Sequence, residues 1–458
     1  MRILHIIHDL KKAAGPTPFC VNVCNRIAQT GAEVSILLGV ADAESKELFT
    51  QSKVRLTDQW ADINAGPKPD LVHIHSLWTP LSHAGASYAR ANNIPYVISA
   101  HGMLAPWALK HKWFKKRVAW WLYQKRDLEG AAMIHVTAEC EIRWLRDLGF
   151  KQPYVLAPLG SDLPELSSGK ANGRGDIKTV LFVGRIYPVK GLMNLVRAWG
   201  CLKRRTEDGG RRAEDGIESS SFIPRPASFP CWQLVIAGPD QAGHKAELVA
   251  EASRLGLTVA DQAPDELAGS GNHERLPDLV FTGPVYGGEK DALYRMADLF
   301  VLPSFTENFG VVVTDALSYG IPVITTKGTP WSELLGDSDS SSGRDCDRAL
   351  VGEYKDEGQR IVDRRLEAIK TDPTRVELTN SRTNEYTRTG RAGWWIEIGV
   401  NPLAEALREA MGLTDEERCQ MGLRGRDLVE SKYAWPAISE QIKVAYTTLF
   451  KCAEQAGM

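Results

Sequence analysis

The stretch Val301-Leu-Pro-Ser-Phe-Thr-Glu-Asn-Phe-Gly310, continuing through Val311-Val-Val-Thr-Asp315 to Gly320-Ile-Pro-Val-Ile-Thr-Thr-Lys327, decides the fold class. Residues 297–302 form an apolar run of strand length, and residues 303–308 have the composition of a turn. Apolar residues then recur at helical spacing until the Gly-Ile-Pro sequence ends the helix, and another apolar run follows. A strand, turn, helix and strand in this order predict a βαβ unit of an open parallel sheet.

Two carboxylates flank the predicted helix. Ligands of open α/β sheets bind beyond the carboxyl ends of the strands, which places Glu307 at a ligand site. Asp315 follows about two helical turns into the helix, so both side chains can face one crevice. The first amides of the helix, at Asn308, Phe309 and Gly310, favour an anion because unpaired N–H groups and the positive dipole end meet there. A hydroxyl-rich ligand bearing phosphate suits this arrangement; alternatively, Glu307 caps the helix and Asp315 is solvated.

This stretch resembles the Glu-x7-Glu signature of the retaining family-four glycosyltransferases, also called glycosyl transferases group 1. The resemblance implies an α/β fold of GT-B architecture, in which two Rossmann-like domains face each other across a cleft. In that family the first Glu approaches the donor sugar and the second bonds the ribose hydroxyls of the nucleotide. These roles transfer to Glu307 and to Asp315, where a shorter Asp replaces the second Glu.

A second motif lies upstream at Gly184-Arg-Ile-Tyr-Pro-Val-Lys190-Gly191. It follows a run typical of a buried strand and precedes an apolar helical pattern, so Arg185 and Lys190 lie on a loop near the predicted phosphate. Arg can bind phosphate oxygens bidentately and Lys adds a compact charge, although both could be solvated surface cations. The segment matches the family's Gly-Arg-x4-Lys-Gly motif at every fixed position, which implies that Gly184, Arg185 and Lys190 bind the donor diphosphate.

Composition agrees with a large enzyme of two or three domains. The 458 residues include 55 Lys and Arg and 57 Asp and Glu, and this balance makes nucleic acid an improbable partner. Eight cysteines are scattered without a C-x2-C pair, which indicates neither a zinc framework nor a disulfide scaffold. Without an apolar run of roughly 18 to 20 residues or a secretory signal, the chain is expected to be cytoplasmic. Neither metal nor cofactor is expected, because Arg185 and Lys190 would do electrostatically at the diphosphate what a metal does elsewhere.

The first half repeats the strand-helix pattern. A strand at residues 3–7 leads through a loop to a helix that starts near Thr17 and Pro18 and stops at Gly31. The family usually carries a glycine pair in this loop, where backbone approaches the donor phosphate or acceptor. Only Gly15 remains here, and the resemblance assigns it to the donor site.

Three histidines follow on later strands. His73 and His75 point to the same side of a strand, which could suit a metal, but no further ligand follows at useful spacing and structural histidines are the favoured interpretation. His101 ends a strand immediately before Gly102, at the carboxyl edge of the sheet. The segment around it resembles the family segment whose His lies near the donor sugar and the reacting centre, although a His bonded in the core is the alternative.

The segment Lys110–Arg126 interleaves cations with large aromatic residues. On a helix, such a segment could lie on an anionic membrane surface with the cations toward the headgroups. The alternative is an ordinary helix whose aromatics enter the core. Because members of the family often use lipid-linked acceptors, peripheral contact with the inner face of a membrane is a hypothesis.

The predicted domain boundaries follow from these patterns. Residues 1–165 form the acceptor-side domain and residues 175–432 the nucleotide-sugar domain, with polar inserts near 203–229 and 337–388. Residues 433–458 form a helix that packs back on the first domain, as the family architecture implies. The Asp-x-Asp pairs of the later insert are not interpreted as metal ligands, because they lie in a Ser-rich polar run rather than after a buried strand.

The expected reaction is transfer of a sugar, such as a hexose, from a UDP- or GDP-sugar to a hydroxyl of a glycan or lipid-linked acceptor, with the anomeric configuration retained. His101, Arg185, Lys190 and Glu307 are the expected catalytic residues. Surface polysaccharide biosynthesis is the role that the family suggests. A sugar-nucleotide epimerase or phosphorylase on the same scaffold and a catalytically silent binding module remain alternatives, and the sugar, base and acceptor stay open.

Overall fold

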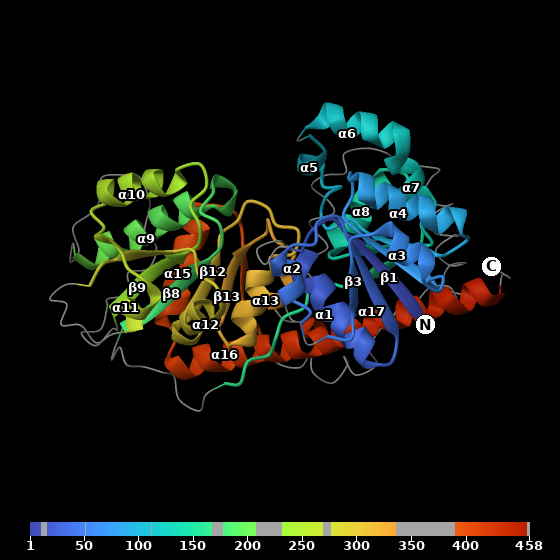
Figure 1. The fold of residues 1–458 in the computed structure, drawn as a ribbon. Coiled ribbons are helices and arrows are strands. Elements are labelled where there is room, and N and C mark those ends of the chain that lie inside the picture. The colour runs from blue at the N-terminus through green and yellow to red at the C-terminus, as the bar shows by residue number, and fades with distance from the viewer. Residues whose placement is uncertain are drawn as a thin grey trace, which may run out of the picture. The chain divides into compact units, whose positions relative to one another are not determined.

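The computed structural model describes residues 1–10, 16–50, 52–110, 112–166, 177–207, 231–268, 276–335 and 390–455. The chain divides into two compact units (Figure 1). The first comprises the described residues of Met1–Ser161 and Ser431–Met458, and the second those of Asp162–Ala349 and Asn384–Glu430. Gly15 and residues 337–388 of the later predicted insert lie outside the described residues.

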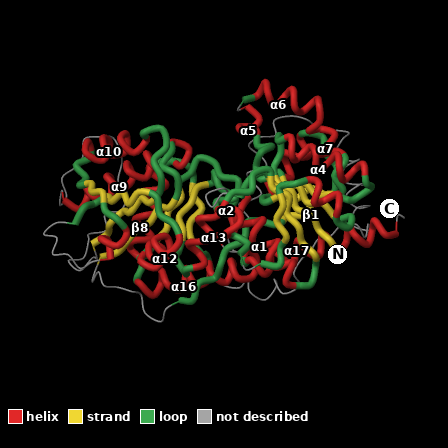
Figure 2. The backbone as a smooth tube through the Cα atoms, in the orientation of Figure 1, coloured by secondary structure: helices red, strands yellow, loops and turns green. Residues whose placement is uncertain are grey.

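The first unit contains a parallel sheet of seven described strands in the order β3-β2-β1-β4-β5-β6-β7. Figure 2 draws strands in yellow and helices in red, with β1 labelled in this sheet. The central strands β1 and β4 are paired so that His5 lies opposite His73. The strands are β1 Arg2–Ile7, β2 Glu33–Leu38, β3 Arg55–Thr57, β4 Leu71–His75, β5 Tyr96–Ser99, β6 Met133–Val136 and β7 Tyr154–Leu156.

Helices cover both faces of this sheet. On β1, Ile3 and Ile7 pack with residues of α1 and α17, whereas Leu4 and Ile6 pack on the opposite face with residues of α4, α7 and α8. This alternation follows from the two-residue period of a strand. The helices are α1 Pro16–Gln29, α2 Ala43–Glu47, α3 Trp60–Ala65, α4 Pro80–Ala91, α5 Pro106–Lys110, α6 Trp113–Ala119, α7 Lys125–Glu129, α8 Glu139–Asp147 and α17 Trp435–Gln455.

The second unit also contains seven described parallel strands, in the order β10-β11-β9-β8-β12-β13-β14. The strands are β8 Ile177–Val183, β9 Cys231–Ala237, β10 Val259–Asp261, β11 Leu279–Gly283, β12 Leu299–Leu302, β13 Val323–Thr326 and β14 Gly393–Ile396. The helices are α9 Leu192–Glu207, α10 His244–Arg254, α11 Pro264–Ala268, α12 Gly287–Met296, α13 Val311–Ser318, α15 Val400–Gly412 and α16 Asp415–Leu428. The βαβ unit predicted from residues 297–327 is confirmed as β12, α13 and β13.

The first predicted insert starts later than the sequence indicated. Helix α9 continues to Glu207, so the residues after 202 that were predicted to begin the insert are helical. Lys203 anchors this part of the helix, because its Nζ atom bonds the Trp232 carbonyl oxygen at 3.2 Å and lies 2.9 Å from Asp278 Oδ1. A helix of polar composition persists where its side chains find such partners. Residues 208–229 lie outside the described residues.

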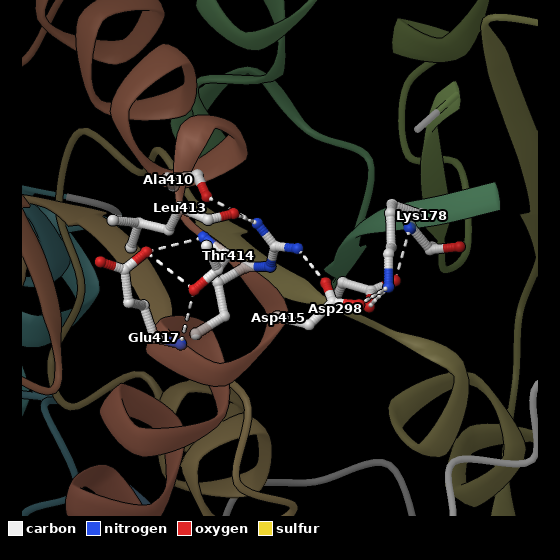
Figure 3. A network of polar contacts seen from close by, with 9 residues as sticks. Lys178, Asp298, Ala410, Leu413, Thr414, Asp415 and Glu417 are labelled. Atoms are coloured by element: carbon white, nitrogen blue, oxygen red, sulfur yellow. Dashed lines mark hydrogen bonds and ion pairs between the residues drawn. The ribbon is translucent and has the colours of Figure 1, made fainter. Parts of the chain in front are cut away.

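A polar network ties helix α16 to the first strand of the second sheet (Figure 3). Thr414 and Glu417 form a reciprocal capping box at the start of α16. Lys178 of β8 lies 2.7 Å from Asp415, in the first turn of α16, and 3.6 Å from Asp298, which precedes β12.

The predicted fold of two Rossmann-like domains is confirmed, because each unit contains a parallel sheet of seven described strands with helices. Among the described residues, each helix is too short or too polar to cross a bilayer.

Candidate functional site in the second unit

Lys190 and Glu307 meet at the carboxyl ends of two adjacent strands. Lys190 follows β8 and Glu307 follows β12, and these strands pair in parallel. The Nζ atom of Lys190 lies 2.5 Å from Glu307 Oε1, and the Ser304 hydroxyl donates to the same oxygen at 2.7 Å. Both charged side chains are only 14% exposed, so water screens the pair weakly. The predicted sugar-binding carboxylate and phosphate-binding lysine therefore share one site.

Backbone contacts fix the two loops against each other. The Phe305 amide donates to the Val189 carbonyl at 2.9 Å. Gly191 has a φ of +68°, and a Cβ atom there would lie 2.0 Å from the Pro303 carbonyl oxygen. Only glycine accommodates both the left-handed conformation and this close approach. The last Gly of the Gly-Arg-x4-Lys-Gly motif thus lets two loops touch. These are residues 184–191, which carry Lys190 (the lysine loop), and residues 303–310, which carry Glu307 (the glutamate loop).

The other end of the motif, at Gly184 and Arg185, lies against the loop that follows strand β9. The Gly184 amide donates to the Ala237 carbonyl at 2.9 Å, and a Cβ atom on Gly238 would meet the Gly184 carbonyl oxygen at 1.9 Å. Arg185 is exposed, and its guanidinium donates to Gln241 Oε1 at 3.3 Å. Arg185 is therefore held toward this loop, while Lys190 is held by Glu307.

Asp315 has a partner that the sequence analysis missed. Its Oδ2 atom lies 2.6 Å from Nζ of Lys290 in α12, and the Asp315 side chain is 17% exposed. Lys290 belongs to no motif of the sequence, and only its contact with Asp315 in the tertiary structure identifies it. Glu307 and Asp315, the two carboxylates of the predicted donor site, are thus each balanced by a lysine.

Helix α13 begins beside the glutamate loop. Gly310 precedes it with a φ of +80°, and the Phe309 carbonyl accepts a hydrogen bond from the Trp331 indole at 2.6 Å. The Glu307 amide donates to the Gly328 carbonyl at 2.9 Å. The helix starts at Val311, so the amides of Asn308 and Phe309, which were predicted to open it, lie before its first turn. Anion binding by the amides of Asn308, Phe309 and Gly310 stays a prediction.

His101 lies just beyond β5 in the first unit, with a left-handed φ of 47°. Its Nε2 atom is 3.5 Å from His75 Nδ1. Burial, together with the nearby His135, lowers the pKa of His101 to about 3, so the ring is neutral near pH 7. A neutral imidazole at this position can donate or accept a hydrogen bond without adding charge.

His73 and His75 belong to a buried polar row on the sheet face under α1 and α17. His73 bonds the Tyr446 hydroxyl through Nδ1 and the Ser99 hydroxyl through Nε2, the latter at 2.6 Å. His75 bonds His5 at 3.0 Å. Hydrogen bonds within the core thus account for both histidines that the sequence placed on one strand face.

The aromatic segment Lys110–Arg126 leaves much of its apolar surface exposed. Trp121 is 73% exposed and Leu122 75%, while Phe114 is 67% exposed. Trp120 instead packs against Phe150. The segment therefore combines a half-buried face with an exposed aromatic and aliphatic face on α6 and the π-helix Trp120–Gln124 that follows it.

Comparison with known families identifies the chain. Residues 14–160 match a model described as glycosyl transferase 4-like domain, and residues 166–388 match one described as glycosyl transferases group 1. The chain belongs to the family-four, group 1 glycosyltransferases. Both the lysine loop and the glutamate loop lie within the group 1 match.

Curated relatives are similar over part of their length. The D-inositol 3-phosphate glycosyltransferase of Actinosynnema mirum is 29% identical, covering 37% of this chain and 34% of the relative. That of Kineococcus radiotolerans is 28% identical, covering 56% of this chain and 53% of the relative. The sulfoquinovosyl transferase of Arabidopsis thaliana is 32% identical, covering 24% and 25%. The chain thus spans from a quarter to about half of the length of these relatives.

Solved structures match over nearly the whole chain. HepE of Anabaena, solved in complex with UDP, has a TM-score of 0.63 at 15% identity, covering 98% of this chain and all of that one. Sucrose-phosphate synthase of Thermosynechococcus elongatus has a TM-score of 0.61 at 16% identity, covering 98% and 99%. At this level of identity the likeness establishes the fold, and the predicted GT-B class is confirmed.

Proposed function

We propose that this member of the family is a retaining, metal-independent glycosyltransferase that moves a sugar from a UDP- or GDP-sugar to an acceptor hydroxyl. The observation on which this proposal rests is the partly buried contact between Lys190 and Glu307 at the carboxyl ends of β8 and β12. That edge is where open parallel sheets bind ligands. It offers a cation for a diphosphate and a carboxylate for sugar hydroxyls within one small site.

Lys190 and Arg185 would stabilise the charge that grows on the leaving diphosphate. Preorganised cations at a developing charge act without reorganisation during the reaction, which is the electrostatic role that a metal ion has elsewhere. The exposed guanidinium of Arg185 is free to approach a phosphate by exchanging its contact with Gln241. Lys190 would interact with both phosphate and Glu307.

Glu307 would orient the hydroxyls of the donor sugar. The Ser304 hydroxyl and the Lys190 ammonium both contact its Oε1 atom, which holds the carboxylate in one orientation. A carboxylate fixed in this way accepts hydrogen bonds from hydroxyls with little further loss of side-chain freedom. Asp315, held by Lys290, would bond the ribose, and His101 would offer a neutral ring to the sugar near its anomeric carbon.

The proposed retention follows the family chemistry. The acceptor hydroxyl attacks the anomeric carbon on the face from which the diphosphate leaves, and the leaving phosphate oxygen takes the acceptor proton. The bond from the anomeric carbon to the diphosphate breaks as the new glycosidic bond forms. We assign no covalent nucleophile to the chain.

The first test is a thermal-shift panel of UDP, GDP, ADP and their sugar conjugates in EDTA, on the wild type and on Lys190→Ala. The proposal expects a large shift with one nucleotide that Lys190→Ala loses. Lys443→Ala is the matched control, because it removes another Lys–Glu contact, an exposed one on α17. Absence of a shift with every nucleotide would favour a catalytically silent module.

Turnover separates the proposed transferase from an epimerase. A transferase releases nucleoside diphosphate only when an acceptor is present, whereas an epimerase converts the donor without any acceptor. The acceptor panel includes lipid-linked saccharides, inositol phosphate and glycans, since relatives are named for inositol phosphate and sulfoquinovosyl transfer. We expect Glu307→Ala to abolish turnover while the protein stays folded.

The exposed face of α6 and of the π-helix that follows it supports a peripheral membrane location for this reaction. Trp113, Phe114, Val118, Trp121 and Leu122 are each at least 45% exposed. The sequence Lys115-Lys-Arg117 adds cations to the same short helix. Aromatic side chains with nearby cations favour the interface of an anionic bilayer. A lipid-linked acceptor in surface polysaccharide assembly, at the inner face of the membrane, is the role that we propose.

A further inference from the structure

Helix α1 carries two buried cysteines directly over the buried histidine of strand β1. Cys20 and Cys24 are four residues apart, so both lie on one helix face. His5 lies between Ile3 and Ile7 of β1, whose side chains pack toward α1. The side chains of His5, Cys20 and Cys24 are fully buried. Thiols and imidazole of two elements therefore converge in the core of the first unit.

The spacing of the three groups is that of metal ligands. One ring nitrogen of His5 and the two sulfur atoms all lie within 4.8 Å of one another. The two sulfur atoms are 3.9 Å apart. Two thiolates at about 2.3 Å from a tetrahedral zinc ion stand about 3.8 Å apart, so the observed sulfur separation fits without rearrangement of the helix.

His5 is arranged as a ligand rather than as a satisfied core residue. Its Nδ1 atom bonds His75 Nε2 at 3.0 Å, while its Nε2 atom is buried and has no hydrogen-bond partner among the described residues. Buried ring nitrogens are ordinarily paired, so an unpaired one in a histidine that lies beside two thiols points to a further ligand. If Nδ1 donates its proton to His75, the lone pair of Nε2 is left for a cation. Metal-binding histidines usually make such a hydrogen bond with the ring nitrogen that does not bind the metal.

We propose that His5, Cys20 and Cys24 bind a zinc ion that joins helix α1 to strand β1. Two thiolates neutralise the divalent charge, so the occupied site would carry no net charge into the core. Three protein donors leave a fourth position on zinc. Because all three side chains are fully buried, the role that we assign to the ion is to hold α1 against β1.

Proton release provides a signature that needs no variant. Cysteine thiols are ordinarily protonated near pH 7 when no metal is bound. Zinc binds the thiolate form, and binding should release about two protons for each zinc ion. Adventitious zinc on surface carboxylates would release almost none near pH 7.

The test uses the full chain, purified under reducing conditions, stripped with a chelator and titrated with Zn²⁺ and Co²⁺. We expect one equivalent of metal, about two protons released, and cobalt spectra with thiolate charge-transfer bands of a tetrahedral site. Cys20→Ser and Cys24→Ser should each lose these bands. Cys419→Ser removes an exposed cysteine of the second unit and should retain them.

Other results would overturn the assignment. Failure of the wild type to take up Zn²⁺ or Co²⁺ would do so even if the Cys20 and Cys24 variants fold poorly. Bands that survive in Cys20→Ser and Cys24→Ser but vanish in Cys419→Ser would place the metal elsewhere. A chain that binds Cu⁺ and rejects Zn²⁺ and Co²⁺ would exclude zinc.

Discussion

Lys190 and Glu307 stand 117 residues apart in the chain, yet the lysine Nζ atom lies 2.5 Å from the glutamate Oε1 atom. The two residues follow the parallel strands β8 and β12, which end at the same edge of the second sheet, and Gly191 allows the two loops to touch. The contact places a cation and a carboxylate where a nucleotide sugar would need both. Substitutions at or beside this contact should therefore change turnover, nucleotide binding and stability in ways that can be measured separately.

Replacing Lys190 by Ala should lower turnover by about 100-fold or more, because a preorganised charge at the leaving group is lost. Nucleotide release in the presence of acceptor measures this effect. The Lys443→Ala control should retain wild-type turnover. Equal turnover in Lys190→Ala and the wild type would contradict the proposed leaving-group role.

Gly191→Ala should destabilise the protein more than Gly243→Ala. Both glycines have left-handed φ values, +68° and +74°, so each alanine carries a backbone strain of about 1 to 2 kcal/mol. At Gly191 the new methyl would also lie 2.0 Å from the Pro303 carbonyl, whereas nothing lies within 4 Å at Gly243. Overpacking adds about 1 to 3 kcal/mol.

Urea unfolding of both glycine variants measures the difference. Gly191→Ala should in addition weaken nucleotide binding, because the lysine loop must move away from the glutamate loop. Comparable free energies of unfolding for the two variants would show that the loops separate without penalty.

Asp315→Ala should weaken nucleotide binding by about tenfold or more, as expected for loss of a hydrogen bond to a charged group. Asp315→Glu, which restores the residue usual in the family, should keep most of the affinity. Asp291→Ala is a matched control on the neighbouring helix, since it removes the contact with Arg295. Calorimetric titration with the nucleotide separates these cases, and unchanged affinity in Asp315→Ala would remove Asp315 from the ribose site.

Stability should fall as the pH drops below about 6.5. Burial lowers the pKa of His135 to about 4, against the opposing effect of its bond to the Ala157 carbonyl. Between the ordinary pKa of about 6.5 and the folded value, the unfolded chain binds a proton that the folded chain does not. The free energy of unfolding therefore decreases with falling pH in this window, by on the order of 2 kcal/mol between pH 7.5 and 5 from this residue alone.

Chemical unfolding at these two pH values, in the presence of a chelator, measures the effect. The neighbouring His73 and His101 have lowered pKa values as well, so the wild-type dependence should be steep. His135→Gln should make the decrease in the free energy of unfolding between pH 7.5 and 5 smaller by the contribution of His135, on the order of 2 kcal/mol. An unchanged slope in this variant would show that His135 does not contribute.

Trp121→Ala combined with Leu122→Ala should reduce binding to vesicles that contain anionic lipid. These side chains are 73% and 75% exposed, so their removal should leave the fold intact. Ile398→Ala is the control, an aliphatic residue of the second unit that is 41% exposed. Cosedimentation at low salt measures the effect, and a wild type that stays wholly in the supernatant would refute the membrane hypothesis.

The sequence by itself determined the fold class and the motif residues. Alternating strand and helix patterns are local, and the turn residues around Gly184 and Gly310 mark the ends of strands, so the βαβ order could be predicted. The motifs then located Arg185, Lys190 and Glu307 on loops. The GT-B architecture that the resemblance implied agrees with solved structures of that fold over nearly the whole chain.

Tertiary structure alone decided which side chains meet. The contact of Asp315 with Lys290 and the meeting of His5 with Cys20 and Cys24 depend on how helices pack beside strands, which no local pattern encodes. The sequence also left open whether the aromatics of residues 110–126 enter the core, because either face of an amphipathic helix can be buried. Packing resolved this by burying only part of that segment and leaving Trp121 and Leu122 in solvent.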